Sequence, residues 1–116
     1  MSVQEALDYK ETGYASWYGG TKRRLRTSSG EHINPRTSLT AAHKTLPMPC
    51  KVKVTCLKTG KSVIVRVNNR GPFQSNRLID LTPAAAHRIN LKGRGIGKVR
   101  LEVVSVGDGK YEIFAR

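Results

Sequence analysis

Two carboxylates stand apart in a strongly basic stretch of this sequence. Between residues 12 and 101 the chain carries 18 lysines and arginines but only two acids, Glu31 and Asp80. Paired carboxylates are what acid–base chemistry on a glycosidic bond requires. Glu31 follows a Ser-Gly turn sequence and Asp80 precedes a Thr-Pro pair, so neither is expected on a solvated helix face. The pair is the first indication of an active site.

Both residues also have simpler interpretations. Glu31 could be an exposed acid in a loop. Asp80 could cap the helix that follows it or pair with Arg77. His43 could be a structural histidine at the end of an apolar turn, whereas His32 and His87 are expected on the surface.

Charge and length narrow the class of protein. A chain of 116 residues is expected to form one domain with a modest core. A net charge of +13 implies an anionic partner, which could be nucleic acid, an acidic membrane surface or an acidic polysaccharide. No window approaches the ~18 apolar residues of a membrane helix. The polar segment 1–13 shows no signal peptide, which leaves a cytoplasmic protein or the mature part of an exported one.

Short runs of alternating apolar and polar residues predict a β-rich domain. A Lys-Thr-Gly turn at 58–60 and a Gly-Asp-Gly turn at 107–109 are typical of hairpins. Pro83 preceded by Thr82 predicts a helix over 83–89, and a second helical turn is expected at 39–44. Residues 19–38 are expected to form a long basic loop. The expected strands cover residues 14–18, 51–54, 62–67, 98–103 and 110–115.

The two cysteines are expected to be free. Cys50 and Cys56 flank one alternating run. Six strand residues would separate their Cα atoms by roughly 20 Å, far beyond the ~7 Å limit of a disulfide. Without a Cys-x-x-Cys motif a zinc site is not expected, and we expect neither metal nor cofactor.

Four segments in order resemble the rare lipoprotein A family, bacterial septal lytic transglycosylases. They read Gly-Tyr-Ala-Ser-Trp-Tyr-Gly at 13–19, Thr-Ser-Ser-Gly-Glu at 27–31, Leu-Thr-Ala-Ala-His-Lys-Thr-Leu-Pro at 39–47, and Val-Arg-Val-Asn-Asn-Arg-Gly-Pro-Phe through Ile-Asp-Leu at 65–81. The resemblance covers roughly residues 13–104. It implies a mainly β fold, a six-stranded double-psi β-barrel with one or two short helices. We expect residues 1–12 to be an N-terminal extension and 13–116 to be the barrel domain.

The resemblance implies cleavage of peptidoglycan glycan strands, preferably those stripped of peptides, to 1,6-anhydro-muramyl products. It places Glu31, His43 and Asp80 at catalytic positions, with Asn69 where the family has an aspartate. An amide cannot take up a proton, so this substitution would weaken the site. One carboxyl group can still protonate the leaving oxygen and later accept the proton of the attacking sugar hydroxyl. The substrate-binding candidates are Tyr14, Tyr18, Arg70 and Phe73.

We also expect a monomer in the bacterial cell envelope, periplasm or outer membrane, with membrane contact only through a lipid anchor outside this chain. The positive charge fits the lactyl carboxylates of peptide-free strands. Two alternatives remain: a non-catalytic glycan-binding barrel like the expansin domains, and a basic nucleic-acid-binding domain. Against the latter, the seven aromatic residues do not interleave with the basic loop as a stacking platform requires.

Overall fold

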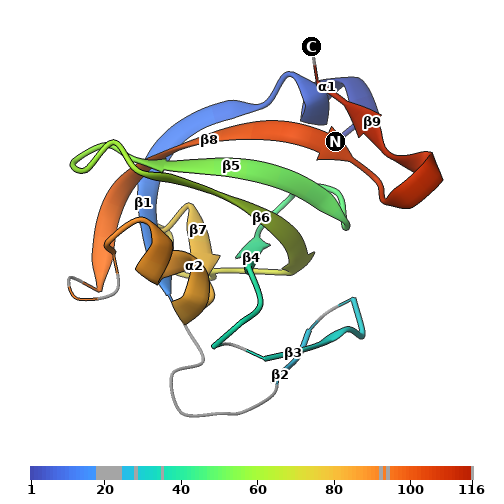
Figure 1. Ribbon diagram of the computed structural model, residues 1–116. Coiled ribbons are helices and arrows are strands. Elements are labelled where there is room, and N and C mark those ends of the chain that lie inside the picture. Colours follow the sequence, from blue (N-terminus) through green and yellow to red (C-terminus); the bar gives the residue numbers. More distant parts are fainter. Residues whose placement is uncertain (18–24, 28, 35, 92, 94, 116) are drawn as a thin grey trace.

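Figure 1 shows a computed structural model of the chain, which describes residues 1–17, 25–27, 29–34, 36–91, 93 and 95–115. In these residues two short α-helices, one 3₁₀ helix and nine strands follow one another. In order they are α1 (Val3–Leu7), β1 (Lys10–Trp17), β2 (Leu25–Arg26), β3 (His32–Ile33), β4 (Thr40–His43), β5 (Cys50–Cys56), β6 (Ser62–Asn69), β7 (Ile79–Leu81), α2 (Pro83–Arg88), β8 (Ile96–Val106), η1 (Gly109–Tyr111) and β9 (Ile113–Phe114).

Six strands close into a barrel. The sheet runs β1-β7-β4-β6-β5-β8, and β8 pairs again with β1 to close it, while β9 extends β8 outside the barrel. The pairs β1–β7 and β4–β6 are parallel, and the other pairings in the barrel are antiparallel. The six-stranded double-psi barrel implied by the resemblance is confirmed.

Alternation along the strands sets the core, as the sequence predicts. In β5 the side chains of Cys50, Val52, Val54 and Cys56 are all fully buried, and those between them face outward. Cys50 and Cys56 form no disulfide in the described part of the chain, as expected from their separation along one strand. Burial raises the pKa of the Cys50 thiol to about 12, so it stays protonated.

The helix expected at 83–89 is α2, and it fixes the strand that carries Asp80. The hydroxyl of Thr82 accepts a hydrogen bond from the backbone N–H of Ala85 and donates one of 2.6 Å to the carbonyl of Ser38. The helix lies against the barrel (Figure 1). Its residues Ala85 and Ala86 are fully buried in the core. Because α2 starts directly after β7, this anchoring holds the end of β7 in place.

Three local predictions differ from the structure. The helical turn expected at 39–44 is wrong, because β4 pairs with β6 on one side and β7 on the other, and this pairing overrides local preference. The last strand is shorter than expected, because η1 takes up its first residues. Within the expected basic loop, β2 and β3 form a hairpin, whereas its basic residues at 22–24 lie outside the described residues.

The N-terminal segment is packed on the barrel. Ser2 and Glu5 form a capping box at the start of α1, and Ala6 is fully buried in the core. The boundary expected between residues 12 and 13 falls inside β1, which begins at Lys10.

Candidate active site

A single row of residues crosses four neighbouring strands. Ser16 of β1 pairs with Asp80 of β7, Asp80 pairs with Ala42 of β4, and Ala42 pairs with Asn69 of β6. Residues paired across strands point to the same face. Between β4 and β6 the register shifts by one residue after Ala41, so that Ala42 pairs with Asn69 and not with Asn68. Flanking residues such as Ala41 are buried in the core, so this row faces outward. We call these four residues the cross-strand row.

Asp80 is a half-buried carboxyl group in the middle of this row. Its Oδ1 accepts a hydrogen bond of 3.0 Å from the Ser16 hydroxyl. Burial raises the pKa of Asp80, and the Ser16 hydrogen bond and the charge of Arg77 oppose this only in part. Asp80 therefore keeps its proton to a higher pH than a solvated aspartate.

Glu31 has the opposite environment. Arg66 donates from Nη1 to Oε1 at 2.7 Å and from Nη2 to Oε2, so the two side chains form a bidentate pair. Asn68 donates from Nδ2 to Oε1 at 3.0 Å. The Arg66 hydrogen bonds, more than any other cause, lower the pKa of Glu31. The carboxylate is held ionised.

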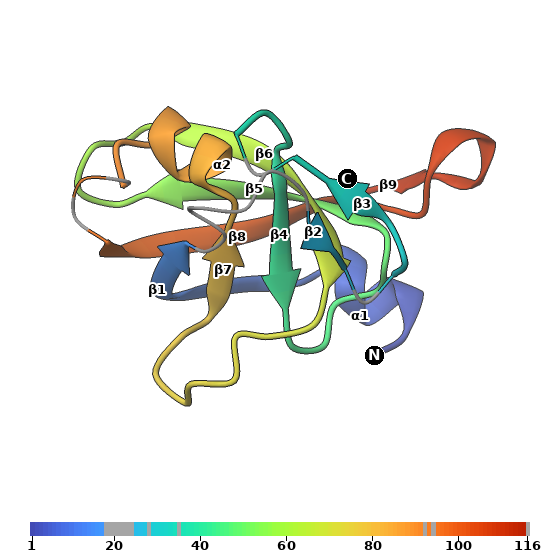
Figure 2. The ribbon, with the colours of Figure 1, turned by 90° about the horizontal axis from the view of Figure 1, so that it is seen from below.

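A tight turn between β2 and β3 brings Glu31 to this position. The N–H of Thr27 donates to the carbonyl of Glu31, and Gly30, with φ of 87°, donates to the carbonyl of Thr27, both at 2.9 Å. A left-handed residue here favours glycine. Ser29 donates to the carbonyl of Asn68 at 3.3 Å, which ties the turn to β6. Figures 1 and 2 show the β2–β3 hairpin below the barrel, on the side of β4 and β6.

The two carboxylates lie over the same face of the sheet. Arg66 pairs with Thr40, which lies two residues from Ala42 and so shares the outward face of the cross-strand row. Strand β4 separates β6 from β7, which corresponds to about 10 Å between their backbones. Ala42 lies between them on β4 and is 4% exposed.

His43 does not join this group. It is 3% exposed and lies on the other face of β4 from Ala42. Its Nδ1 accepts backbone hydrogen bonds from Thr45 and Leu46, both 3.2 Å, so the remaining proton is on Nε2, 3.0 Å from the Tyr9 hydroxyl. Tyr9 in turn donates to Glu11. Burial is the main cause that lowers the pKa of His43 to about 4.

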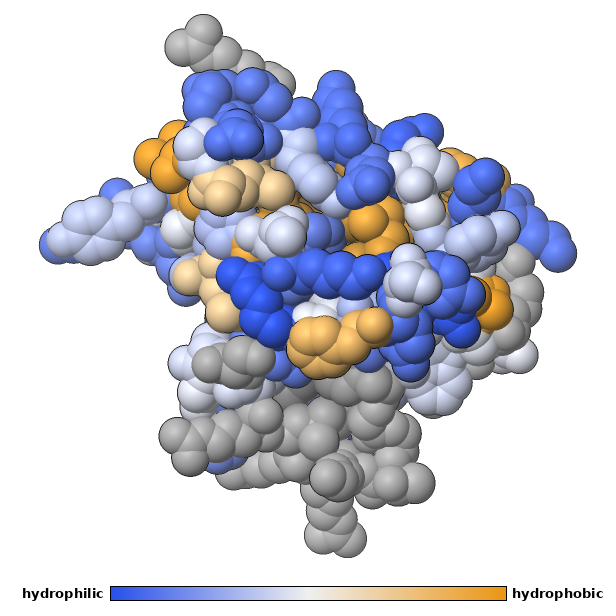
Figure 3. Space-filling view, turned by 180° about the vertical axis from the view of Figure 1, so that it is seen from behind, coloured by the Kyte–Doolittle hydropathy of each residue, from blue (hydrophilic) through white to orange (hydrophobic). Residues whose placement is uncertain are grey.

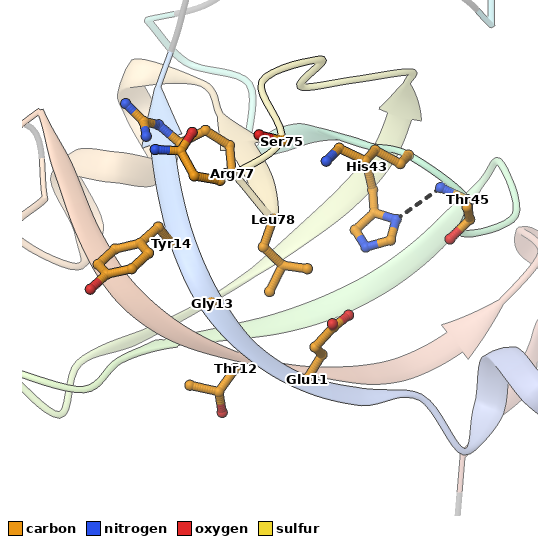
Figure 4. A pocket seen from close by; sticks show the side chains of 11 residues that line it. Glu11, Thr12, Gly13, Tyr14, His43, Thr45, Ser75, Arg77 and Leu78 are labelled. Atoms are coloured by element: carbon orange, nitrogen blue, oxygen red, sulfur yellow. Dashed lines mark hydrogen bonds between the residues drawn. The ribbon is translucent and has the colours of Figure 1, made fainter.

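A pocket of about 350 Å³ opens beside His43 (Figure 4). Its walls are residues 11–14 of β1, residues 43–45 at the end of β4 and residues 75–78 ahead of β7. In Figure 4 Tyr14 and His43 lie on opposite sides of Leu78. The pocket therefore lies at the end of β1 and β7 that precedes the cross-strand row.

The predicted substrate-binding residues fall at different places. Tyr14 is 48% exposed and Phe73 is 87% exposed, so both can meet a ligand. Arg70 donates from Nη1 to the carbonyls of His43 and Leu46, at 3.2 and 2.7 Å, and braces that turn. Tyr18 lies outside the described residues.

Sequence reasoning missed Ser16, Arg66 and Asn68 as members of the site. All three lie inside the segments that carry the family resemblance. The alternation of valines at 63, 65 and 67 places Arg66 on the outward face, which was the available clue. Nothing local indicates that the Glu31 turn reaches β6. Within the described ranges, no three His, Cys, Asp or Glu side chains cluster as metal ligands would.

Comparison with known proteins identifies relatives along most of the chain. The family described as lytic transglycolase matches residues 10–101. The endolytic peptidoglycan transglycosylase RlpA of Rickettsia typhi is 55% identical over 97 residues, 81% of this chain and 30% of the relative. The RlpA of Vibrio cholerae is 52% identical over 104 residues, 90% of this chain and 39% of the relative. The chain thus spans well under half the length of these relatives.

Solved structures share the fold at low identity. Streptomyces papain inhibitor superposes with a TM-score of 0.66 at 20% identity, covering 82% of this chain and 94% of the inhibitor. An expansin of Clavibacter michiganensis, crystallised without ligand, gives a TM-score of 0.66 at 16% identity, covering 87% of this chain and 53% of the expansin. A mutant of that expansin, in complex with cellohexaose, gives 0.66 at 15% identity with the same coverage.

Proposed function

The chain belongs to the lytic transglycolase family, and from this premise we propose that it cleaves the glycan strands of peptidoglycan by lytic transglycosylation. In this reaction the C6 hydroxyl of a muramyl residue attacks its own C1. The bond from C1 to the next sugar breaks and a 1,6-anhydro end forms. No water is consumed.

Asp80 is the proposed proton donor, and its half-buried position in the cross-strand row is the observation that carries the proposal. As the bond from C1 breaks, the Asp80 carboxyl group gives its proton to the departing oxygen. The resulting carboxylate then takes the proton of the C6 hydroxyl as that oxygen bonds to C1, which restores the acid. The raised pKa suits the first step, and the Ser16 hydrogen bond stabilises the carboxylate between the steps.

We assign Glu31, which the resemblance places at a catalytic position, a role other than proton transfer. Arg66 binds both oxygens of the Glu31 carboxylate, and protonation would break this ion pair. Glu31 is therefore rarely protonated and is a poor proton donor. We assign the Glu31–Arg66 pair to sugar binding. Its polar atoms provide a fixed wall for hydroxyl and acetamido groups across β4 from Asp80.

His43 and Asn69 support the site in other ways. Both ring nitrogens of His43 are engaged, so it positions the turn after β4 rather than moving protons. Asn69 lies two strands from Asp80 in the cross-strand row. Its amide binds substrate without placing a second negative charge beside the acid.

The charge of the chain indicates the preferred substrate. A net charge of +13 attracts the lactyl carboxylates that strands expose once their peptides are removed. On the face seen in Figure 3 hydrophilic side chains predominate.

Among the described residues no helix has the length and hydrophobicity needed to cross a membrane. We assign the protein to the cell envelope, as a monomer whose membrane contact would come from a lipid anchor elsewhere.

A non-catalytic glycan-binding barrel is the second candidate. The fold shared with an expansin, and Asn69 at a family aspartate, favour it. Incubation with peptide-stripped glycan strands followed by mass spectrometry separates the two. Lytic cleavage yields anhydro ends lighter by one water than hydrolysis products. A binding module leaves the strands intact.

A further inference from the structure

The pocket beside His43 adjoins the proposed catalytic acid. Arg77, in its wall, is close enough for its positive charge to act on the pKa of Asp80. Tyr14, which also lines the pocket, lies two residues before Ser16 on β1, so both side chains point to the same side about 7 Å apart. A chain bound over the cross-strand row can therefore continue into this pocket.

The pocket presents two cations to a ligand. Lys44 and Arg77 both line it, and among the described residues neither forms an ion pair with an acid. The ammonium group of Lys44 donates one hydrogen bond of 3.3 Å to the carbonyl of Gln74, which leaves two of its N–H donors for a ligand. The carboxylate in the lining, Glu11, already accepts from the Tyr9 hydroxyl. Two cations and one carboxylate leave the lining with a net formal charge of +1.

The other walls suit a sugar ring. Tyr14 exposes 48% of its surface and offers an aromatic face. A Cβ at Gly13 would lie 3.0 Å from the Leu78 side chain, so the close packing of Leu78 on β1 favours glycine there. Thr12, Thr45 and Ser75 also line the pocket. A volume of about 350 Å³ lies at the small end of the range for ligand sites, roughly 300–1,000 Å³.

We propose that this pocket is a subsite for a carboxylate-bearing sugar of the glycan strand, next to the sugar that reacts at Asp80. Arg77 and Lys44 bind the lactyl carboxylate, and Tyr14 packs on the ring. This rests on the proposed function for the identity of the polymer. It adds a specificity-determining site, which selects muramyl residues whose carboxylate is not blocked by a peptide.

Binding of single sugars tests the subsite without any cleavage. Wild-type protein labelled with ¹⁵N is titrated with N-acetylmuramic acid, its methyl ester and N-acetylglucosamine, and amide shifts are followed by NMR. We expect saturable shifts at residues 12–14 and 75–78 with N-acetylmuramic acid. The ester and N-acetylglucosamine should bind about tenfold more weakly, the loss expected for one charge-assisted contact.

Three variants locate the carboxylate. Arg77→Gln and Lys44→Gln should each weaken N-acetylmuramic acid about tenfold while leaving N-acetylglucosamine unchanged. Lys53→Gln is the matched control, because it removes one exposed charge from the middle of β5, and it should bind as wild type does. Thermal unfolding of each variant verifies the fold.

The outcomes separate this proposal from the function it rests on. Equal binding of acid and ester, no binding of either, or an equal loss in Lys53→Gln would overturn the subsite. If wild type forms anhydro ends under those outcomes, only the subsite is wrong. If the subsite binds as expected and no strand is cleaved, the subsite stands and the transglycosylase assignment fails.

Discussion

Arg66 donates hydrogen bonds to both carboxylate oxygens of Glu31 and so holds the turn between β2 and β3 against the outer face of β6. The same face carries Asp80, the other acid of the basic stretch, whose burial acts in the opposite direction. One carboxyl group is kept charged and the other is kept protonated to a higher pH. Such a divergence assigns different chemical roles to two similar groups.

The pH dependence of cleavage should follow Asp80. Because a proton donor must be protonated, activity should fall as the pH rises through the raised pKa of Asp80. Ser16→Ala removes the hydrogen bond that lowers this pKa, so the fall should move to higher pH. Rates of anhydro-product formation against pH measure this. Ser62→Ala, at an exposed position of β6, should leave the profile unchanged.

Breaking the Glu31–Arg66 pair should impair sugar binding more than folding. Glu31→Gln and Arg66→Met should each raise KM several-fold. The cost to stability should be about 1 kcal/mol or less, because the pair is partly exposed. The pKa of Glu31 is lowered, so the stability that it adds is present above its unfolded pKa and is lost as the pH falls through its folded pKa.

Glu102→Gln is the control for this pair. It breaks an ion pair with Arg100 of comparable exposure on β8. Its KM should equal that of wild type. Equal kinetic losses in all three variants would show that the Glu31–Arg66 pair has no specific role in binding.

His43 should act on stability and not on the pH profile of the reaction. Its folded pKa of about 4 lies below the ordinary histidine value of 6.5. The neutral ring therefore stabilises the fold above pH 6.5, and this stability is lost as the pH falls towards 4, by roughly 3 kcal/mol in all. Urea unfolding of wild type and His43→Gln between pH 4 and 7 measures it.

Tyr9→Phe is a second test of the structural role of His43. It leaves the Nε2 proton of His43 without its partner and should cost about 1–3 kcal/mol of stability. The pH optimum should be kept. The pH dependence of activity is compared between wild type and His43→Gln. If wild type shows an inflection near pH 6.5 that the variant lacks, the positioning role of His43 is contradicted.

The sequence predicts the barrel more fully than the site. Alternation in β5 and β6 identified core residues such as Val52 and Val65, and Thr82 with Pro83 marked the start of α2. The helical turn expected at 39–44 failed because strand pairing on both sides, which is non-local, decides β4.

The site depends on contacts that local patterns do not encode. The spacing between Glu31 and Arg66 follows no period, since their contact depends on how one turn folds over a distant strand. His43 lies in a family motif, but its burial and its hydrogen bond to Tyr9 depend on the tertiary structure. Motifs can therefore name the residues of a site without giving the protonation state of each.

Asn69→Asp should raise the pKa of Asp80 rather than supply a second proton donor. The new carboxylate would add a negative charge about two strand spacings from Asp80, close to 10 Å. A like charge raises the pKa of a carboxyl group. We expect faster cleavage above neutral pH, measured as anhydro ends per minute. Asn90→Asp, outside the cross-strand row and after α2, is the charge control. Equal rates for Asn69→Asp and wild type at every pH would contradict the proximity of the two positions.

The central claim is that Asp80 transfers the proton in a lytic reaction. Asp80→Asn keeps the shape of the side chain and can keep the Ser16 contact. Its cleavage of peptide-stripped glycan, followed by mass spectrometry, should be ~10²–10⁴-fold slower than that of wild type, with glycan binding unchanged. Wild type should form 1,6-anhydro ends. Cleavage by Asp80→Asn at the wild-type rate, or wild-type products with hydrolysed ends, would contradict the account.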